Sequence, residues 1–495
     1  MGIKKYFATQ DNTITNAFKE NLVTRGTGSN MGAADILEAF VIHGQTSAAI
    51  NATNAEQSRF LIQFPLTDIS SDMSAGTIPN DSGSLKFYLN LYNAPHGNTT
   101  PLSYSLGVYM VGEPWSEGRG LDMNNYTDLG YSNWVSASST TGWTNPGGTV
   151  VSGPQTSGSY FFETGLENLR LDVSQQVYKW LNGDNQNYGF LIRFPDSFVS
   201  GSDTMYTKMF FSRTSEYYNY RPTLEAWWDS SRKDNRGNFN ISSSAVPAAD
   251  NLNTLYLYNV VRGQLKNIPN LAGDTLNLEI YSGSTSPTGD PLTIVDSDGN
   301  SGTSVTAGLL VENNVTTTGI YTASFASTSS LTTVYDVWST GSGGSRVEYY
   351  TGSYTPISVT PSSLIYEEKY VTSMPNLEAS YVKGSKPTLR LFARKKNWSP
   401  NIYTKATEVV VPEIIEDGYY QLYRMIDGME IIPYGTGSVN NYYSRLSYDV
   451  SGNYFELDTS YIEPGYAYGI KFSYYLQGTY QEQPEVFKFR IEEDQ

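Results

Sequence analysis

The chain combines 39% hydrophobic residues with only 16% charged residues over 495 positions, which is the composition of a folded rather than a disordered protein. Its formal net charge of −17 repels phosphate backbones, so nucleic acid is not expected as a partner. It contains no cysteine, which excludes disulfide bonds and thiolate metal sites.

The first residues bear on where the protein is made. The stretch MGIKKYFATQ lacks the apolar core of a secretory signal, and Tyr6 stands where a myristoylation motif requires Ser or Thr. No later stretch approaches the roughly 18 apolar residues of a membrane span. We therefore expect a protein that is synthesised and folded in a cytoplasm and does not insert into a membrane.

Alternation of apolar and polar residues is the main structural signal. Every odd position of 85–92 (LKFYLNLY) is apolar, and Phe60, Ile62 and Phe64 follow the same rule. The pattern returns in later stretches, at Tyr188, Phe190, Ile192 and Phe194, at Leu389 and Leu391, and at Phe487, Phe489 and Ile491. A strand places such residues on one face, whereas a helix would scatter them around its axis. The pattern predicts strands throughout the chain.

Two short stretches have helical spacing instead. The first, around Ala17, Asn21 and Leu22, is weak. The second, 172–181, has a clearer apolar face with capping residues at both ends, formed by Val173, Val177, Trp180 and Leu181, with Asp172 or Ser174 before it and Gly183 after it. We predict a helix there, packed on the end of a sandwich.

Composition divides the chain into three predicted domains. Residues 1–228 form the first. Residues 229–250 are polar, rich in Ser and Asn, and predict a linker. Residues 251–358 hold strands spaced at ~8–12 residues with Gly, Ser and Thr turns, which is typical of an immunoglobulin-like sandwich. Residues 359–495 show the same pattern of strands and turns with more Tyr, and this pattern predicts a second such sandwich.

The first domain contains a series of short motifs in a fixed order. They are 11–14 (DNTI), 30–32 (NMG), 58–64 (SRFLIQF), 85–92 (LKFYLNLY), 113–117 (EPWSE), 171–174 (LDVS) with Val177 and Trp180, 187–193 (NYGFLIR), 211–213 (FSR) and 221–224 (RPTL). In this order they resemble the DNRLRE-type domain, a jelly-roll sandwich akin to carbohydrate-binding modules. The resemblance covers a little under half of the chain and implies the fold more than glycan binding. We expect Trp115 and Trp180 to fill the core, and Arg59 and Arg193 to pair with carboxylates.

The other two predicted domains are similar to immunoglobulin-like domains of tailed-phage particles. The strand pair 319–325 (GIYTASF) and 334–338 (VYDVW) carries this likeness. The fold class is therefore predicted as all-β, with an N-terminal jelly-roll β-sandwich followed by two immunoglobulin-like β-sandwich domains.

Catalytic chemistry has few candidates in the sequence. The only histidines, His43 and His96, lie far apart, and no Ser stands in a recognisable nucleophile motif. Glycoside hydrolysis needs only two carboxylates, and Glu367 with Glu368, Glu413 with Glu416, and Glu492 with Glu493 are adjacent or nearly so. They occur in polar turns or at the terminus, where carboxylates usually face water. We predict no catalytic residues and no enzyme activity.

One loop, 296–300 (DSDGN), spaces oxygen ligands as a calcium site would. It lacks the full EF-hand spacing and the closing Glu, and Asp-Gly-Asn is also an ordinary hairpin turn. We predict the turn, with no metal and no cofactor.

Paired aromatic residues are the remaining signal. The chain has 40 Tyr against 20 Phe, and adjacent rings occur at 217–220 (YYNY), 227–228 (WW), 349–350 (YY), 442–443 (YY) and 474–475 (YY). On a strand, one ring of each pair points outward. Outward Tyr and Trp rings bind protein partners or stack on sugars.

These observations predict a non-enzymatic structural component of a tailed bacteriophage particle, in the neck, in the tail or associated with the capsid. Its partners would be copies of itself and other virion proteins, and it would lie in the virion after synthesis in the host cytoplasm. A glycan-binding receptor protein of a tail fibre, which would bind a host surface polysaccharide, is the alternative. A polysaccharide-active enzyme with accessory domains is a third, more remote one.

Overall fold

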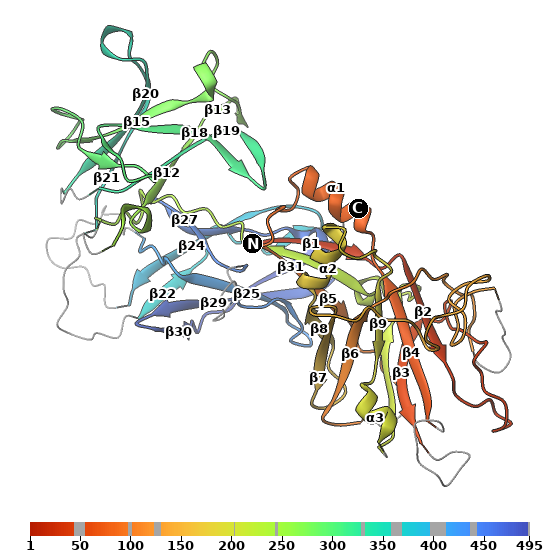
Figure 1. Ribbon diagram of the computed structural model, residues 1–495. Helices are drawn as coiled ribbons and strands as arrows, with labels where there is room; N and C mark the ends of the chain where they lie inside the picture. Colours follow the sequence, from red (N-terminus) through yellow and green to blue (C-terminus); the bar gives the residue numbers. More distant parts are fainter. Residues whose placement is uncertain are drawn as a thin grey trace. The chain divides into compact units, whose positions relative to one another are not determined.

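The computed structural model describes residues 1–43, 55–97, 101–122, 130–201, 203–242, 246–327, 332–357, 369–396, 412–435 and 443–493. The chain divides into two compact units, Gly2–Trp228 and Asp229–Gln495, the latter together with Met1. Strands dominate both units, so the predicted all-β class is confirmed (Figure 1). Every helix among the described residues is too short or too polar to cross a lipid bilayer.

The unit Gly2–Trp228 contains two antiparallel sheets. The first has the order β1 (Gly2–Phe7), β11 (Thr223–Trp228), β5 (Leu85–Leu91) and β8 (Leu169–Asp172). The second has the order β10 (Met205–Phe211), β3 (Ile36–Ile42), β4 (Glu56–Gln63), β9 (Phe190–Arg193), β6 (Tyr104–Met110) and β7 (Ser157–Phe162), and β2 (Gln10–Thr15) also pairs with β4.

Apolar residues at alternate positions hold the two sheets together. On β5, Leu85, Phe87, Leu89 and Leu91 are fully buried in one core, as the alternation predicts. Strands β4 and β9 are buried on both faces. Phe60 and Ile192 point into this core. Their neighbours Leu61 and Leu191 belong to a second cluster with Trp115, Trp134 and Trp143.

The helices cover the ends of the strands, as Figure 1 shows for α1 (Leu66–Ser74), α2 (Ser174–Leu181) and α3 (Asp196–Ser200). The predicted helix at 172–181 is confirmed: α2 buries Val177 and Trp180, and Gly183 follows it with a φ of 79°. The Asp172 carboxylate accepts the Ser174 N–H at 2.9 Å.

The weak helical prediction near the start is wrong. The side chain of Asn21 accepts the N–H groups of Val23 (3.0 Å) and Thr24 (2.9 Å), which closes a turn instead of a helix. Asn commonly bonds to its own backbone in this way, in competition with helical hydrogen bonds. Leu22 consequently has a φ of 51° and is exposed.

The unit Asp229–Gln495 begins with a six-stranded antiparallel sheet. Its order is β12 (Asn253–Tyr258), β19 (Val315–Phe325), β18 (Val305–Glu312), β15 (Leu276–Ser282), β20 (Val334–Thr340) and β21 (Val347–Tyr354). Two small ribbons accompany it, β13 (Val260–Val261) with β14 (Gln264–Leu265), and β16 (Ile294–Val295) with β17 (Ser301–Gly302). Trp338 and Tyr321 are fully buried in its core.

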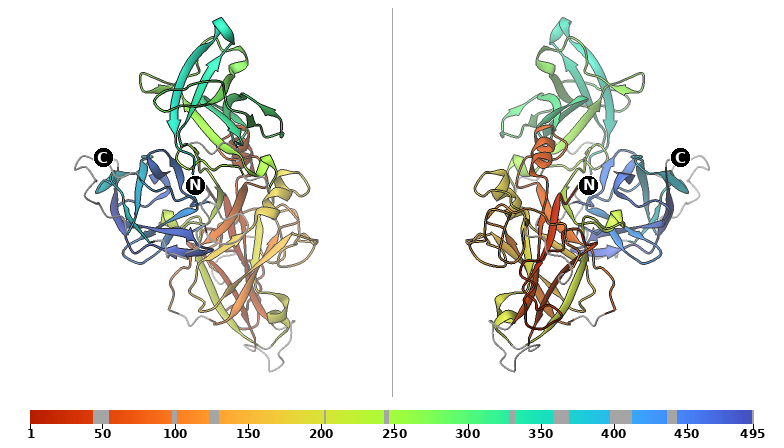
Figure 2. Two further views of the ribbon diagram at one scale, coloured as in Figure 1. Left: turned by 90° about the vertical axis from the view of Figure 1, so that its left-hand side faces the viewer. Right: turned by 90° about the vertical axis from the view of Figure 1, so that its right-hand side faces the viewer.

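Two further sheets follow in the same unit. One has the order β22 (Tyr370–Ser373), β24 (Thr388–Lys395), β28 (Gly452–Glu456) and β27 (Ser447–Asp449). The other has the order β23 (Ser380–Val382), β31 (Phe487–Glu492), β29 (Ala467–Leu476), β25 (Gly418–Arg424) and β26 (Glu430–Ile432), and β30 (Thr479–Glu482) pairs with β29. Only the β23–β31 pair among the described strands is parallel. The strands β12–β21, green to teal in Figure 2, and the strands β22–β31, mostly blue, belong to different sheets.

The predicted linker 229–250, described apart from 243–245, makes specific side-chain bonds within its unit. Arg236 donates from Nε (3.1 Å) and Nη2 (2.5 Å) to Asp336 Oδ2 on β20. Asp336 is 0% exposed, and its Oδ2 also accepts the Trp338 indole N–H at 2.7 Å. Asn235 donates to the Tyr448 hydroxyl on β27 at 3.1 Å. The polar side chains of this segment are therefore hydrogen-bond partners for strands of both predicted immunoglobulin-like domains.

We predict that Arg236→Ala lowers the free energy of unfolding of this unit by about 3–5 kcal/mol, because it leaves Asp336 buried without its counter-charge. The matched control is Arg232→Ala, which removes a half-exposed ion pair with Glu312 (2.7 Å) and should cost at most about 1 kcal/mol. Urea denaturation of the full chain measures both. Equal losses for the two variants would contradict the assignment.

Candidate protein-binding surface

Strand β21 forms the outer edge of the six-stranded sheet. Among the described residues it pairs only with β20. Seven of its eight residues are exposed or half-buried, and they include the large side chains of Val347, Tyr349 and Tyr350. An edge strand offers a row of unpaired backbone N–H and C=O groups to another chain. Here that row is flanked by exposed apolar and aromatic side chains.

Strand β21 pairs on one side with β20, which is itself buried. Strand β20 is buried over Val334–Ser339, with Trp338 in the main core and Tyr335 and Val337 in a small cluster with Tyr281. The β20–β21 register shifts between Trp338 and Ser339, which pair with Tyr350 and Glu348. Tyr349 is therefore the extra residue of a bulge. A bulge re-aims side chains, and both tyrosines are exposed here, at 39% and 43%.

Charge near β21 is largely neutralised. Arg346, just before the strand, bridges Glu279 (2.7 Å) and Glu348 (3.3 Å) and donates to the Tyr281 hydroxyl (3.0 Å). The guanidinium of Arg236 lies 5.5 Å from the ring centre of Tyr350. In a chain with a net charge of −17, this edge carries little of the charge that would repel a second copy.

The other aromatic pairs give different outcomes. Tyr474 is fully buried while Tyr475 is exposed, and Trp227 is buried while Trp228 is half-buried, as alternation predicts. Tyr217 and Tyr218 are both exposed, because they precede and begin a 3₁₀ turn, η1 (Tyr218–Tyr220), rather than lying on a strand. Tyr442 lies outside the described residues.

The two histidines belong to separate elements. His43 follows β3, and its Nε2 lies 3.1 Å from the carbonyl oxygen of Phe198. His96 lies in the turn after β5. A carbonyl contact fixes the His43 ring but supplies no nucleophile to activate.

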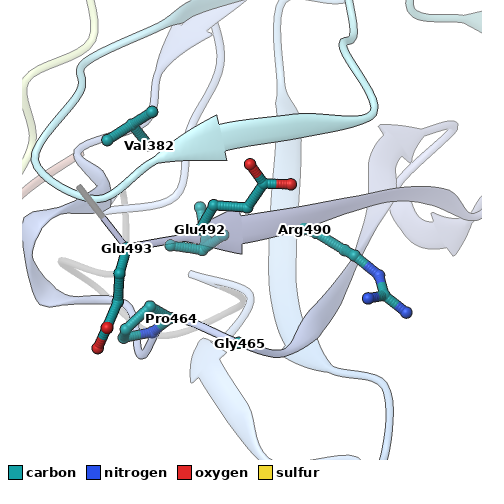
Figure 3. Close-up of a pocket in the computed structure, with 7 residues that line it drawn as sticks. Val382, Pro464, Gly465, Arg490, Glu492 and Glu493 are labelled. Carbon is teal, nitrogen blue, oxygen red and sulfur yellow. The ribbon is translucent and has the colours of Figure 1, made fainter. Parts of the chain in front are cut away.

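The carboxylate pairs that were considered for hydrolysis, and predicted not to be catalytic, have separate surroundings. Glu413 lies 4.0 Å from Lys395, and Glu416 accepts from Asn238 at 3.2 Å. Glu492 and Glu493 line a surface hollow of about 740 Å³ together with Val382, Pro464, Gly465, Arg490 and Ile491. Their carboxylates point in different directions there, and the Arg490 guanidinium points away from both (Figure 3). Glu367 and Glu368 lie outside the described residues.

The loop 296–300 is a hairpin turn between β16 and β17, as predicted. Asp296 Oδ1 accepts the N–H groups of Asp298 (2.9 Å) and Asn300 (2.8 Å), and these bonds lower the pKa of Asp296. The lone pairs of this oxygen are thus already used by the backbone. Within the described ranges, no group of three or more His, Asp or Glu side chains could hold a metal ion.

The two arginines of the DNRLRE-like motifs lie side by side on β4 and β9. Arg193 pairs with Asp196, as expected. For Arg59 the expectation of a carboxylate partner is wrong. It donates to the Gly147 carbonyl (3.0 Å) and to Gln57 Oε1 (2.8 Å), and it stacks on Trp134 at 4.7 Å. Burial and the neighbouring Arg193 lower the pKa of Arg59 to about 9. Trp115 and Trp180 are buried as predicted.

One carboxylate pair was missed because its members are distant in sequence. Asp11 on β2 and Glu117 meet at Arg213: Glu117 accepts from Arg213 Nε (2.8 Å) and Nη2 (2.5 Å), and Asp11 accepts the Arg213 N–H (2.6 Å). Burial raises the pKa of Asp11 to about 7. Such a pair can serve in acid–base catalysis when a substrate reaches it, but Asp11 is buried, at 1% exposure. The geometry of the Asp11, Glu117 and Arg213 group indicates a structural contact that connects three segments of the sandwich.

We predict that the stability of wild type relative to Asp11→Asn rises as the pH falls from about 7 to about 4. The raised pKa means that the folded state takes up a proton more readily than the unfolded chain, so acid favours the wild-type fold, by on the order of 3–4 kcal/mol in full. Urea denaturation across this pH range measures the difference. A constant difference would show that Asp11 does not titrate in this range.

No protein-family model matches the chain, and no curated protein matches it. Among solved structures, the chain is similar to alpha-2-macroglobulin of E. coli in its native conformation, over 97% of this chain, with 9% identity and a TM-score of 0.16. The chain spans 28% of the length of that protein. A likeness of this size carries no argument about function.

Proposed function

We propose that this chain is a non-enzymatic structural component of a tailed bacteriophage particle, which binds copies of itself and other virion proteins. The exposed edge strand β21 is the observation that carries the proposal. The resemblance of residues 1–228 to the DNRLRE-type domain and the texture of the later domains support the assignment to a virion. Synthesis in the host cytoplasm, without disulfide bonds, is consistent with the absence of cysteine.

Strand addition is the mode of binding that suits β21. A partner strand would pair with its free backbone groups, while Val347, Tyr349 and Tyr350 would lose their exposed surface. Tyrosine is suited to such a contact because its ring is apolar and its hydroxyl remains compatible with water before assembly. The backbone hydrogen bonds would hold the partner strand, and burial of the rings would add apolar contact area.

We propose that the partner that binds β21 is a second copy of the chain. A two-fold axis between Tyr350 and Thr351 would pair the strand antiparallel with itself. It sets Tyr349 opposite Gly352 and Glu348 opposite Ser353, so that no like charges face each other. A register centred on Glu348 would instead oppose two carboxylates.

We expect Tyr350→Lys to weaken self-association at least tenfold, because it places a charged side chain at each side of the two-fold axis. The matched control is Tyr475→Lys, which changes an equally exposed tyrosine on β29. Sedimentation of the full chain over a range of concentrations measures the change. A wild type that remains a monomer, or equal weakening by both variants, would overturn the β21 contact.

Glycan binding is the second candidate function, and the aromatic group at η1 favours it. Tyr217 and Tyr218 are 54% and 52% exposed. Neighbouring rings hold them in place: Phe211 lies 5.5 Å from Tyr217, Phe7 lies 4.6 Å from Tyr218, and Arg221 lies over Tyr218 at 5.4 Å. Fixed, exposed rings are suitable platforms for stacking sugars.

If this surface binds a glycan, host surface polysaccharide will raise the melting temperature of the wild-type chain but not that of a Tyr217→Ala/Tyr218→Ala variant. Differential scanning fluorimetry with and without the polysaccharide makes the comparison, and Tyr475→Ala serves as the control. An unchanged wild-type melting temperature at saturating polysaccharide would remove this candidate.

A further inference from the structure

Lys208, on β10, is a lysine enclosed in the apolar core of the first unit. The residue is fully buried. Its Nζ donates to Asn93 Oδ1 at 2.6 Å, to the Gly165 carbonyl at 2.8 Å and to the Glu167 carbonyl at 2.8 Å. No carboxylate hydrogen-bonds to it among the described residues. Buried lysines usually have an ionic partner, so this arrangement requires an explanation.

The fold brings Lys208 and Asn93 together from different sheets. Strand β10 lies at the edge of the seven-stranded sheet, whereas Asn93 follows β5 of the four-stranded sheet and forms a bridge with Phe210. The β3–β10 register shifts between Met205 and Lys208, and Thr207 has a φ of 59°. A β-branched residue rarely adopts this backbone conformation. Such strain persists where the surrounding structure enforces it, often at functional sites.

Burial weakens the preference of the Lys208 side chain for its charged form. The rings of Phe162 and Phe210 lie 4.8 Å and 4.9 Å from Nζ. Burial lowers the pKa of Lys208 to about 8, so a much larger fraction is neutral near physiological pH than for a lysine in water. A neutral amine is a nucleophile, and an ammonium group is not.

The side-chain carbonyl carbon of Asn93, Cγ, is an electrophile that lies close to this amine. The Nζ–Oδ1 distance is 2.6 Å and a C=O bond is about 1.2 Å long, so Nζ is at most about 3.8 Å from Asn93 Cγ. Bound reactants approach to about 3–3.5 Å before reaction. For the attack, the amide must turn so that Nζ faces Cγ instead of Oδ1.

A proton acceptor is also present. The Glu167 carboxylate interacts electrostatically with Lys208. One of its oxygens, Oε1, accepts the N–H groups of Glu163 (3.0 Å) and Thr164 (2.6 Å). The other, Oε2, is buried without a hydrogen-bond partner. Burial raises the pKa of Glu167, but hydrogen bonds from Thr164 and Glu163 outweigh burial and lower this pKa below its ordinary value. The carboxylate is therefore ionised and would hold a proton on Oε2 only transiently.

We propose that Lys208 and Asn93 form an intramolecular isopeptide bond, with Glu167 as the proton acceptor. The Lys208 ammonium gives a proton to Glu167, and the resulting amine attacks Asn93 Cγ. The Nζ–Cγ bond forms, the Cγ–Nδ2 bond breaks, and Nδ2 leaves as ammonia. Protons pass from Nζ to the leaving nitrogen, and Glu167 returns its proton, so the products are a secondary amide and ammonium. No oxidant or cofactor is required.

The bond would join the two sheets of the first unit covalently. It closes a loop between positions 115 residues apart, and long loops gain most from a cross-link in chain-entropy terms. A chain without cysteine would thereby obtain the kind of staple that disulfides provide elsewhere. The inference is independent of what the protein binds.

The test is the mass of the purified full chain. We expect a mass about 17 Da below that of the sequence, for the loss of one ammonia. After tryptic digestion, peptide 87–119 should appear joined to peptide 194–213, uncleaved at Lys208. Fragmentation distinguishes this link from ammonia loss by backbone cyclisation at Asn182–Gly183. A full-length mass that is unchanged after long incubation at about pH 9, above the pKa of Lys208, would overturn the proposal.

Variants test the roles of the residues. Lys208→Met and Asn93→Ala should both restore the full mass, and Glu167→Gln should slow the reaction at least tenfold. Gln keeps the Oε1 acceptor of Glu163 and Thr164, so this last variant should fold even if the first two do not. Circular dichroism verifies the fold. An unchanged rate of cross-linking in folded Glu167→Gln would exclude Glu167 as the proton acceptor.

Discussion

The structure depends on the burial of alternating apolar side chains between paired antiparallel sheets. Strands of both sheets of the first unit contribute one face to a shared core, and β5 alone buries four large residues fully. Burial of one such side chain stabilises a fold by about 1.5–3 kcal/mol. Strands β4 and β9 are enclosed on both faces, because the tryptophan cluster of Trp115, Trp134 and Trp143 covers their outer side. With no cysteine in the chain, this packing carries the stability that disulfides would otherwise share.

A few charged side chains are buried in or beside these cores, and each has defined hydrogen-bond partners. Arg236 reaches Asp336, Asp11 and Glu117 meet at Arg213, and Lys208 is surrounded by three acceptor oxygens. Burying a charge is costly, and a well-packed apolar replacement is often as stable. Their value lies in the specific connections that they make between distant segments. At Lys208 the same desolvation lowers the pKa of the amine, on which the proposed cross-link depends.

The surface follows a different rule from the core. Both rings of an aromatic pair are exposed at two places, at Tyr217 and Tyr218 beside η1 and at Tyr349 and Tyr350 on β21. At both places the backbone departs from regular pairing, through a 3₁₀ turn and through a bulge. Irregular backbone therefore exposes both tyrosines of a pair, whereas the regular strand β29 buries Tyr474 and exposes Tyr475.

Local pattern was sufficient to predict the all-β class, the strand at 85–92, helix α2 with its terminal glycine, and the hairpin turn at 296–300. These features depend on neighbouring residues, so their signal is present in short windows of sequence. The same reasoning failed at Asn21, where a side-chain hydrogen bond outweighed helical spacing, and at Arg59, whose partners are a carbonyl and an amide. Only the tertiary structure decided which distant groups meet, including Lys208 with Asn93, Asp11 with Glu117, and Arg236 with Asp336. These partners are separated by about a hundred residues, and their proximity follows from strand order, which periodicity along the chain does not encode.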